Sequence, residues 1–294
     1  MKLSIGFVGL GIMGAPMCRQ LIAQGYSPLV YDIDDKAVQQ AVLGGAKAAS
    51  LAEIGSRCEI IFTILPNGAV VKEVLFGEGG IAKTLAKGSI VVDMSSVKPA
   101  ESAENANKLA EIGVGFLDAP VSGGEPKAID GTLVFMVGGE QKDFDRVMPF
   151  FKAMGSLATL VGPTGSGSVA KLANQAIVNL NIAVISEALV FAAAAGAKPD
   201  KVYEAIRGGL AGSAVLDAKA PMIFERNFKP GGKISINHKD IGNVLDSSHG
   251  LGVPMPLTAQ LYEIMQYLKR SGGLEEDHAS IVKYFEVLAN ITVK

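Results

Sequence analysis

The first 160 residues alternate short apolar runs with stretches of helical pattern. The apolar runs are of strand length and cover residues 4–8, 28–31, 60–65, 89–92, 115–118, 132–137 and 158–161. Helices are predicted at residues 15–24, 80–86 and 99–112, with Gly113 ending the last of them. Strands that alternate with helices predict an α/β fold, a doubly wound parallel sheet of the Rossmann type.

The pattern changes after residue 162, beyond which only helices are expected. Residues 169–195 contain no proline or glycine and predict one long helix, which we expect to be buried on nearly all sides because it is mostly Ala, Val, Ile and Leu. Shorter helices are expected at residues 199–207, 214–220, 237–245, 257–270 and 281–288, with Asn237 as an N-cap. The sequence therefore predicts two domains, an α/β domain at residues 1–162 and an all-helical domain at residues 163–294.

Four polar side chains interrupt the first half of the long helix. Lys171, Asn174, Gln175 and Asn179 are spaced so that they share one face. A lone lysine at a helix start is more often simply solvated. A lysine followed by three amides on a buried helix needs polar partners, because burying unpaired polar groups is costly. We therefore interpret this face as the floor of a ligand site.

A glycine motif follows the first predicted strand and precedes a helix. Gly9, Gly11 and Gly14 form G-x-G-x-x-G, with Ile12 and Met13 in the last two variable positions. The first glycine allows a tight turn, the second lets backbone approach a pyrophosphate, and the third lets helix and strand pack closely. The motif predicts binding of a dinucleotide at the start of the helix.

An acidic residue ends the second predicted strand. Asp32 stands about where a carboxylate would meet a ribose 2′-hydroxyl, and it is followed by Ile33 and Asp34 rather than by an arginine. Nothing nearby would hold a 2′-phosphate, so NADH is expected to be preferred, with NADPH as the alternative. Asp32, Asp34 and Asp35 could also form a helix N-cap cluster.

Three loops follow predicted strand ends, where ligands bind in such sheets. They are residues 65–67, 94–97 and 119–124. In the last loop, Ser122 followed by Gly123 and Gly124 can present a hydroxyl and successive backbone N–H groups to an anion. The alternative is an ordinary tight turn.

Composition removes several classes of function. The net charge of −2 without a long basic run argues against nucleic acid as a partner. The apolar run at residues 3–10 is too short for a membrane span and leads directly into the glycine motif. The two cysteines, Cys18 and Cys58, lack C-x-x-C spacing, so we expect a cytoplasmic protein with reduced thiols. The three histidines, His238, His249 and His278, form no metal-ligating pair, so we expect no metal site.

Four separated motifs together resemble the β-hydroxyacid dehydrogenase family, and the resemblance covers essentially the whole chain. They are residues 9–14, residues 118–124, the stretch from Gly165 to Asn174 that contains Lys171, and Lys239-Asp240. Four further segments, residues 123–132, 172–175, 206–213 and 226–231, are similar to members that interconvert tartronate semialdehyde and D-glycerate with a nicotinamide cofactor.

The resemblance implies a role for each motif. It implies that Lys171 is the catalytic general acid and base, that Ser122, Gly123 and Gly124 hold a substrate carboxylate, and that Asn174 and Gln175 complete the pocket. It also implies that residues 1–162 are the dinucleotide-binding domain and residues 163–294 the substrate and oligomerisation domain. Many family members have a second asparagine where this chain has Gln175. The resemblance also implies that the cofactor is lined by Leu65, Pro66 and Ser96, and that Lys239 reaches toward the nicotinamide end.

Three rival functions remain open at this point. One is another reductase of the same family, acting on glyoxylate, succinic semialdehyde or 3-hydroxyisobutyrate. Another is a catalytically silent NAD-binding sensor, against which the presence of both Lys171 and Lys239 argues. The third, a purely structural helical assembly, leaves the glycine motif unexplained. In each enzymatic case a homo-oligomer, dimer or tetramer, is expected.

Overall fold

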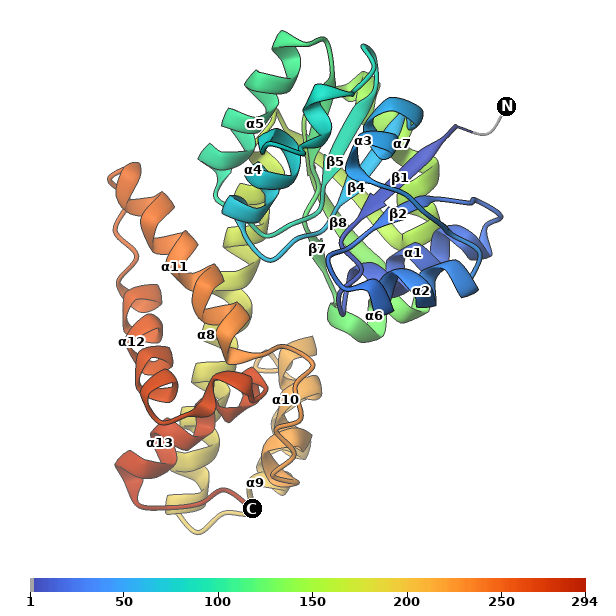
Figure 1. Cartoon of the computed structure of the whole chain (residues 1–294). Coiled ribbons are helices and arrows are strands. Elements are labelled where there is room, and N and C mark those ends of the chain that lie inside the picture. Colours follow the sequence, from blue (N-terminus) through green and yellow to red (C-terminus); the bar gives the residue numbers. More distant parts are fainter. Residues whose placement is uncertain (1–2) are drawn as a thin grey trace. The chain divides into compact units, whose positions relative to one another are not determined.

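The computed structural model describes residues 3–294, which form two compact units (Figure 1). The first unit ends at Lys171 and the second comprises Leu172–Lys294. The boundary falls inside one continuous helix, α8 (Ser166–Ala194).

The first unit is built on one nine-stranded sheet. The strands are β1 (Ile5–Val8), β2 (Leu29–Tyr31), β3 (Lys47–Ala48), β4 (Ile60–Thr63), β5 (Ile90–Asp93), β6 (Gly115–Asp118), β7 (Val121–Ser122), β8 (Leu133–Gly138) and β9 (Gly155–Gly162). Their order is β3-β2-β1-β4-β5-β6-β8-β7, and β9 pairs with β8. The pairs from β3 through β6 are parallel, whereas β8 runs antiparallel to β6 and β7. The predicted doubly wound sheet is confirmed.

Helices cover both faces of this sheet. They are α1 (Gly14–Ala23), α2 (Asp35–Leu43), α3 (Leu51–Arg57), α4 (Gly68–Phe76), α5 (Pro99–Glu111), α6 (Gly124–Asp130) and α7 (Gln141–Met154). Alternate strand residues serve opposite cores: Phe62 packs with residues of α1 and α7, whereas Ile61 packs with residues of α3, α4 and α5. A strand that is buried on both faces has a continuous apolar sequence, which is why the strands could be predicted from the sequence.

The prediction of a helix at residues 80–86 was wrong. The structure has only a short 3-10 turn, Ile81–Lys83, and the true helix of this segment is the earlier α4. Asn67 caps α4 by accepting a hydrogen bond from the N–H of Val70 at 3.0 Å. The glycines at 77, 79 and 80 then separate α4 from the 3-10 turn.

The second unit is all-helical. It contains the larger part of α8 together with α9 (Pro199–Ile206), α10 (Ala214–Phe224), α11 (Ile234–Gly250), α12 (Pro256–Arg270) and α13 (Val282–Ala289), and the 3-10 turns Gly273–Glu275 and His278–Ile281. Two apolar clusters hold it together. One joins α8 to α11 and α12, and the other joins α8 to α10 and α13 (Figure 1).

Two expectations for the helical unit were wrong. The long helix is not buried on nearly all sides: Ile177, Val184 and Phe191 are each more than 60% exposed and lie at intervals of seven on one face. Asn237 is not an N-cap, because α11 begins three residues earlier and Asn237 is a buried residue inside it. Within residues 3–294, α8 is the one helix with the length and composition of a membrane span, and half of its most apolar window is buried.

Candidate active site

The glycine motif forms a tight loop between β1 and α1. Gly9 has φ +99°, and a Cβ there would lie 2.2 Å from the carbonyl oxygen of Ile64. A Cβ on Gly14 would lie 2.0 Å from the carbonyl oxygen of Gly9, whereas one on Gly11 would meet nothing within 4 Å. No side chain caps α1 at its N-cap residue Met13. The loop therefore has the close packing and open helix start that suit a pyrophosphate.

Asp32 joins the end of β2 to this glycine loop. Its Oδ2 accepts a hydrogen bond from the N–H of Leu10 at 2.5 Å, and its Oδ1 accepts one from the N–H of Asp34 at 2.8 Å. The helix cap of this segment is Asp34, whose carboxylate accepts from the N–H of Lys36. The carboxylate of Asp32 thus lies beside the predicted dinucleotide loop, and the next side chain, Ile33, is 93% exposed.

The loop after β4 is anchored by groups that the sequence analysis did not identify. The N–H of Leu65 donates to Ser95 Oγ at 2.8 Å, and that hydroxyl donates to Asp93 Oδ1 at 2.6 Å. Thr63 Oγ1 donates to the same Asp93 oxygen at 2.9 Å. Burial raises the pKa of Asp93 to about 6. Leu65 lies next to Gly9, Pro66 is exposed, and Ser96 is half-buried.

Lys171 and the serine–glycine turn, 50 residues apart in sequence, meet in the first unit. Lys171 Nζ donates to the backbone carbonyl of Val121 at 2.8 Å, and the lysine is 9% exposed. The next residues are Ser122, at the end of β7, and Gly123 and Gly124, which have φ +132° and +67°. The turn therefore needs glycine for its backbone conformation. It places a buried ammonium group one residue from the predicted carboxylate site.

Asp118 fixes the start of the helix that carries Lys171. The N–H groups of Gly165 and Ser168 donate to its two carboxylate oxygens at 2.8 and 2.7 Å. Burial raises the pKa of Asp118, although the hydrogen bonds from these two N–H groups oppose the rise. The only sequence signal for this role was an acid that ends an apolar strand.

In the second unit, Asn174 and Gln175 belong to a buried polar network. Asn174 Nδ2 donates to Gln175 Oε1 at 3.0 Å, and Gln175 Nε2 donates to Asp240 Oδ2 at 2.7 Å. Lys239 Nζ lies 3.0 Å from Asp240 Oδ1 in an ion pair. The longer side chain of Gln175 thus links α8 to the predicted Lys239-Asp240 motif on α11.

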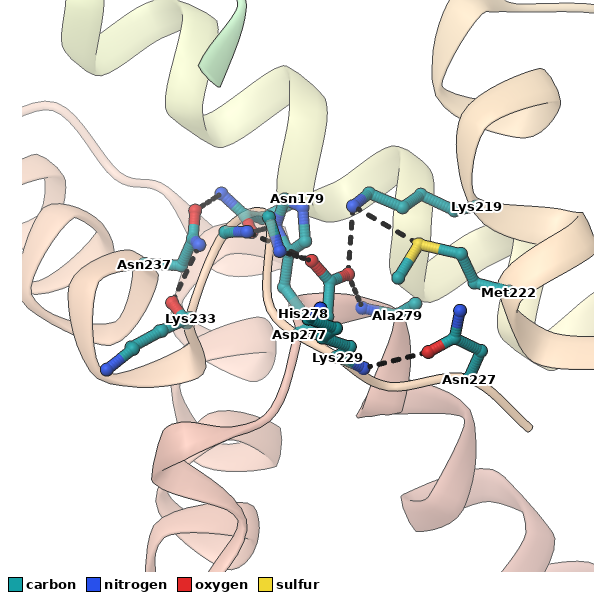
Figure 2. Close-up of polar contacts among 12 residues, drawn as sticks. Asn179, Lys219, Met222, Asn227, Lys229, Lys233, Asn237, Asp277, His278 and Ala279 are labelled. Atoms are coloured by element: carbon teal, nitrogen blue, oxygen red, sulfur yellow. Dashed lines mark hydrogen bonds and ion pairs between the residues drawn. The ribbon is translucent and has the colours of Figure 1, made fainter. Parts of the chain in front are cut away.

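The network continues through Asn179 to the 3-10 turn at residue 278 (Figure 2). Asn179 Nδ2 donates to the carbonyl of Gln175 at 2.9 Å and to Asn237 Oδ1 at 3.1 Å. His278 Nδ1 lies 3.1 Å from Asn179 Oδ1, and burial lowers the pKa of His278 to about 4. The imidazole is therefore neutral near pH 7.

Next to His278, Asp277 forms an ion pair with Lys219 and also holds the loop that precedes α11 (Figure 2). Lys219 Nζ lies 2.8 Å from Asp277 Oδ1, and Asp277 Oδ2 accepts from the N–H groups of Gly231 and Gly232 at 2.9 Å each. Asp277 is completely buried. In the part of the chain that the structure describes, no three His, Cys, Asp or Glu side chains group in a way that could hold a metal ion.

Two protein-family models match the chain, one over each of its two parts. Residues 4–162 match the family model of the NAD binding domain of 6-phosphogluconate dehydrogenase. Residues 165–285 match the model of the NAD-binding region of NADP-dependent 3-hydroxyisobutyrate dehydrogenase.

Individual proteins match over nearly their full length. The chain is 42% identical to 2-hydroxy-3-oxopropionate reductase of Escherichia coli K12, covering 98% of this chain and 99% of the relative. It is 34% identical to 2-(hydroxymethyl)glutarate dehydrogenase of Eubacterium barkeri, covering 99% and 98%. The solved structure of 3-hydroxyisobutyrate dehydrogenase from Mycobacterium tuberculosis superimposes with a TM-score of 0.90 at 26% identity, covering 96% and 99%.

The fold, the glycine loop and these matches define a nicotinamide-dependent hydroxyacid dehydrogenase, an oxidoreductase that acts on CH–OH groups with NAD(P). The chain belongs to the β-hydroxyacid dehydrogenase family.

Proposed function

We propose that this enzyme reduces tartronate semialdehyde to D-glycerate with NADH, reversibly, and that Lys171 is its general acid and base. The contact between Lys171 Nζ and the carbonyl of Val121 carries the proposal, because it brings a buried ammonium group to the Ser122–Gly124 turn. The 42% identity to 2-hydroxy-3-oxopropionate reductase supports this substrate, since 2-hydroxy-3-oxopropionate is tartronate semialdehyde.

The residues of the first unit divide the reaction between binding and proton transfer. The bound nicotinamide supplies the hydride to the aldehyde carbon. The Ser122 hydroxyl and the N–H groups of Gly123 and Gly124 hold the substrate carboxylate, which fixes the position of the carbonyl group. Lys171 then donates a proton to the oxygen as it becomes an alkoxide, and takes the proton back in the reverse direction.

We propose that Asn174, Gln175 and Lys239 support the same reaction. Asn174 would hydrogen-bond the substrate, and Lys239 would act near the nicotinamide. The amide of Gln175 already serves Asn174 and Asp240, which supports a role in orienting those two side chains.

Preference for NADH is proposed from Asp32. Its carboxylate lies beside the glycine loop, and a 2′-phosphate there would meet a like charge. The exposed Ile33 offers no cation to offset that repulsion. A kcat/KM for NADPH equal to or above that for NADH would refute this role.

A panel of small acids tests the substrate. Tartronate semialdehyde, succinic semialdehyde and glyoxylate are assayed with NADH and NADPH at the nicotinamide absorbance, and D-glycerate and 3-hydroxyisobutyrate are assayed with NAD. We expect the highest kcat/KM for tartronate semialdehyde. A higher value for another acid would assign the enzyme a different substrate within the family, whose members are named for different substrates. NADH binding without turnover of any of these compounds would support the alternative that the protein is a catalytically silent NAD-binding sensor.

An exposed apolar stripe supports a homo-oligomer as a further part of the proposal. Ile177, Val184 and Phe191 lie exposed on one face of α8. Burying this apolar surface against a partner would be energetically favourable. We propose that a second copy of the chain covers this stripe, in a cytoplasmic dimer or tetramer. Light scattering after size exclusion should show a larger species that Val184→Glu dissociates, and a monomeric wild-type protein would refute it. The two buried, unpaired cysteines are compatible with the cytoplasm.

A further inference from the structure

Two buried carboxylates stand side by side at the carboxyl ends of neighbouring strands. Asp93 ends β5 and Asp118 ends β6, and the two residues are partners in the parallel register. Each is 1% exposed. Placing two acids together in a buried position is costly, so each needs strong compensating contacts.

The side-chain hydrogen bonds of Asp118 lead toward the start of α8. Its two oxygens accept from the N–H groups of Gly165 and Ser168, at the helix start where donors lack partners in the helix. Ser168 Oγ also lies 3.0 Å from Ser102 Oγ on α5. Lys171 stands three residues after Ser168, so the direction of its side chain depends on how this turn is fixed.

The helix start packs closely against the ends of two strands. A Cβ on Gly167 would lie 2.3 Å from the carbonyl oxygen of Asp118 and 2.5 Å from that of Met136. A Cβ on Gly138 would lie 2.4 Å from Asp118 Oδ1. The first turn of α8 is therefore seated directly on the ends of β6 and β8.

The contacts of Asp93 lead in the other direction, to the loop after β4. Its Oδ1 accepts from Thr63 Oγ1, Ser95 Oγ and the N–H of Ser95. Ser95 Oγ in turn accepts from the N–H of Leu65, in the loop predicted to line the cofactor. The second oxygen, Oδ2, is buried without a hydrogen-bond partner in the described residues.

We infer that Asp93 and Asp118 are positioning residues with different tasks. Asp118 fixes the position of Lys171 through the first turn of α8, and Asp93 fixes the position of Leu65 through Ser95. The first half of this inference rests on the proposed function of Lys171. The second half requires only that the Leu65 loop contacts the cofactor.

The two carboxylates differ in what a substitution would remove. Both oxygens of Asp118 face N–H donors, so Asn at 118 would turn an NH₂ group against one of them. Asp118 also places a negative charge at the start of a 29-residue helix, where the helix dipole favours it. For Asp93, the hydroxyl of Ser95 is the link to the loop, so Ser95→Ala cuts that link and leaves the carboxylate in place.

A double-mutant cycle tests the task of Asp118. In the wild-type background, Asp118→Asn should lower kcat about 10- to 100-fold with the Kd for NADH unchanged, because a small displacement of a catalytic group has effects of this size. In the Lys171→Ala background, the same change should alter the residual kcat less than about twofold, since the group it positions is gone.

A matched pair of serine variants tests the division itself. Ser168→Ala should lower kcat about three- to tenfold and leave the Kd for NADH unchanged, whereas Ser95→Ala should raise that Kd about three- to tenfold with kcat at saturating NADH unchanged. The pair also serves if Asp118→Asn does not fold, because each variant keeps its carboxylate.

The outcomes separate three cases. If Lys171→Ala keeps near wild-type turnover, the proposed function fails. If Lys171→Ala is impaired but Asp118→Asn costs the same factor in both backgrounds, the task of Asp118 is refuted alone. If the two serine variants only lower the melting temperature, or shift kcat and Kd together, the divided tasks are refuted and the carboxylates are merely structural.

Discussion

Three charged side chains of the first unit bond to backbone groups, whereas the amide side chains of the second unit bond mainly to other side chains. Lys171 donates to a carbonyl, and Asp32 and Asp118 accept from N–H groups. In the second unit, by contrast, amide side chains bond mainly to other side chains, as between Gln175 and Asp240. Backbone partners are fixed by strands and helix starts, while side-chain partners can adjust their rotamers.

This difference suggests how each region responds to substitution. In the first unit, a small change should affect chemistry or cofactor binding sharply, because no neighbour can move to replace a backbone contact. In the second unit, the same kind of change should mainly reduce stability, because the loss is shared by a network.

Apart from Lys171 itself, the largest effect is expected in the glycine loop. Gly14→Ala places a methyl group 2.0 Å from the carbonyl oxygen of Gly9. We expect a loss of about 3 kcal/mol or more in unfolding free energy, together with weak NADH binding, because the clash is with backbone. Gly11→Ala is the control: it meets nothing within 4 Å, so folding should be unchanged while NADH binding weakens. Chemical denaturation and NADH titration measure both, and normal NADH affinity in Gly11→Ala would contradict the pyrophosphate position.

Ser122→Ala should have the next largest effect. Removing a hydroxyl bond to a carboxylate costs about 1.5–3 kcal/mol, which is about a 10- to 150-fold loss in kcat/KM. Activity should not vanish, because the N–H groups of Gly123 and Gly124 remain. Steady-state kinetics with tartronate semialdehyde give the answer, and unchanged kinetics would remove the carboxylate from this turn.

Asn179→Ala should show the different behaviour of the second unit. It removes bonds to Asn237, Gln175 and His278, and we expect a loss of about 1–2 kcal/mol in unfolding free energy. The Kd for NADH should not change. Asn181→Ala, which loses one 3.3 Å bond from Ser213, is the matched control and should cost less. If Asn179→Ala left stability intact and changed NADH binding, the two regions would not differ as described.

The smallest net effect is expected from pH, because one group in each unit contributes and the two contributions have opposite signs. The pKa of Asp93 is raised from 3.8 to about 6, so the folded state binds the extra proton and acidification from about pH 6 to pH 4 stabilises it through this group. The pKa of His278 is lowered from 6.5 to about 4, so the same acidification destabilises through the imidazole.

Melting temperatures at several pH values test these signs. Relative to wild type, Asp93→Asn should lose stability on acidification and His278→Gln should gain it, by about 2–4 °C for each kcal/mol. Parallel pH profiles of the two variants and the wild type would contradict both assignments.

Sequence reasoning reached the features that depend on local pattern. The glycine motif, the strands buried on both faces and the unbroken run of α8 each leave a signal of their own. The anchoring by Asp93 and Asp118 left almost none, because which N–H groups lie opposite a carboxylate depends on strand register and on a helix about 50 residues away. Burial of α8 was overestimated because composition does not tell how many neighbours surround a helix. The N-cap at Asn237 was misplaced because its amide bonds across to α8.

The central claim is that Lys171 transfers the proton at a site where NADH is held by other residues. Lys171→Ala should bind NADH with nearly wild-type affinity, since the glycine loop is untouched, and should lose about 10²–10⁴-fold in kcat for tartronate semialdehyde. Lys171→Arg should not restore activity, because a guanidinium stays protonated and cannot cycle its proton. NADH affinity and turnover measured on one purified sample of Lys171→Ala decide the matter. Intact affinity with lost turnover is the predicted result, and near wild-type turnover would contradict it.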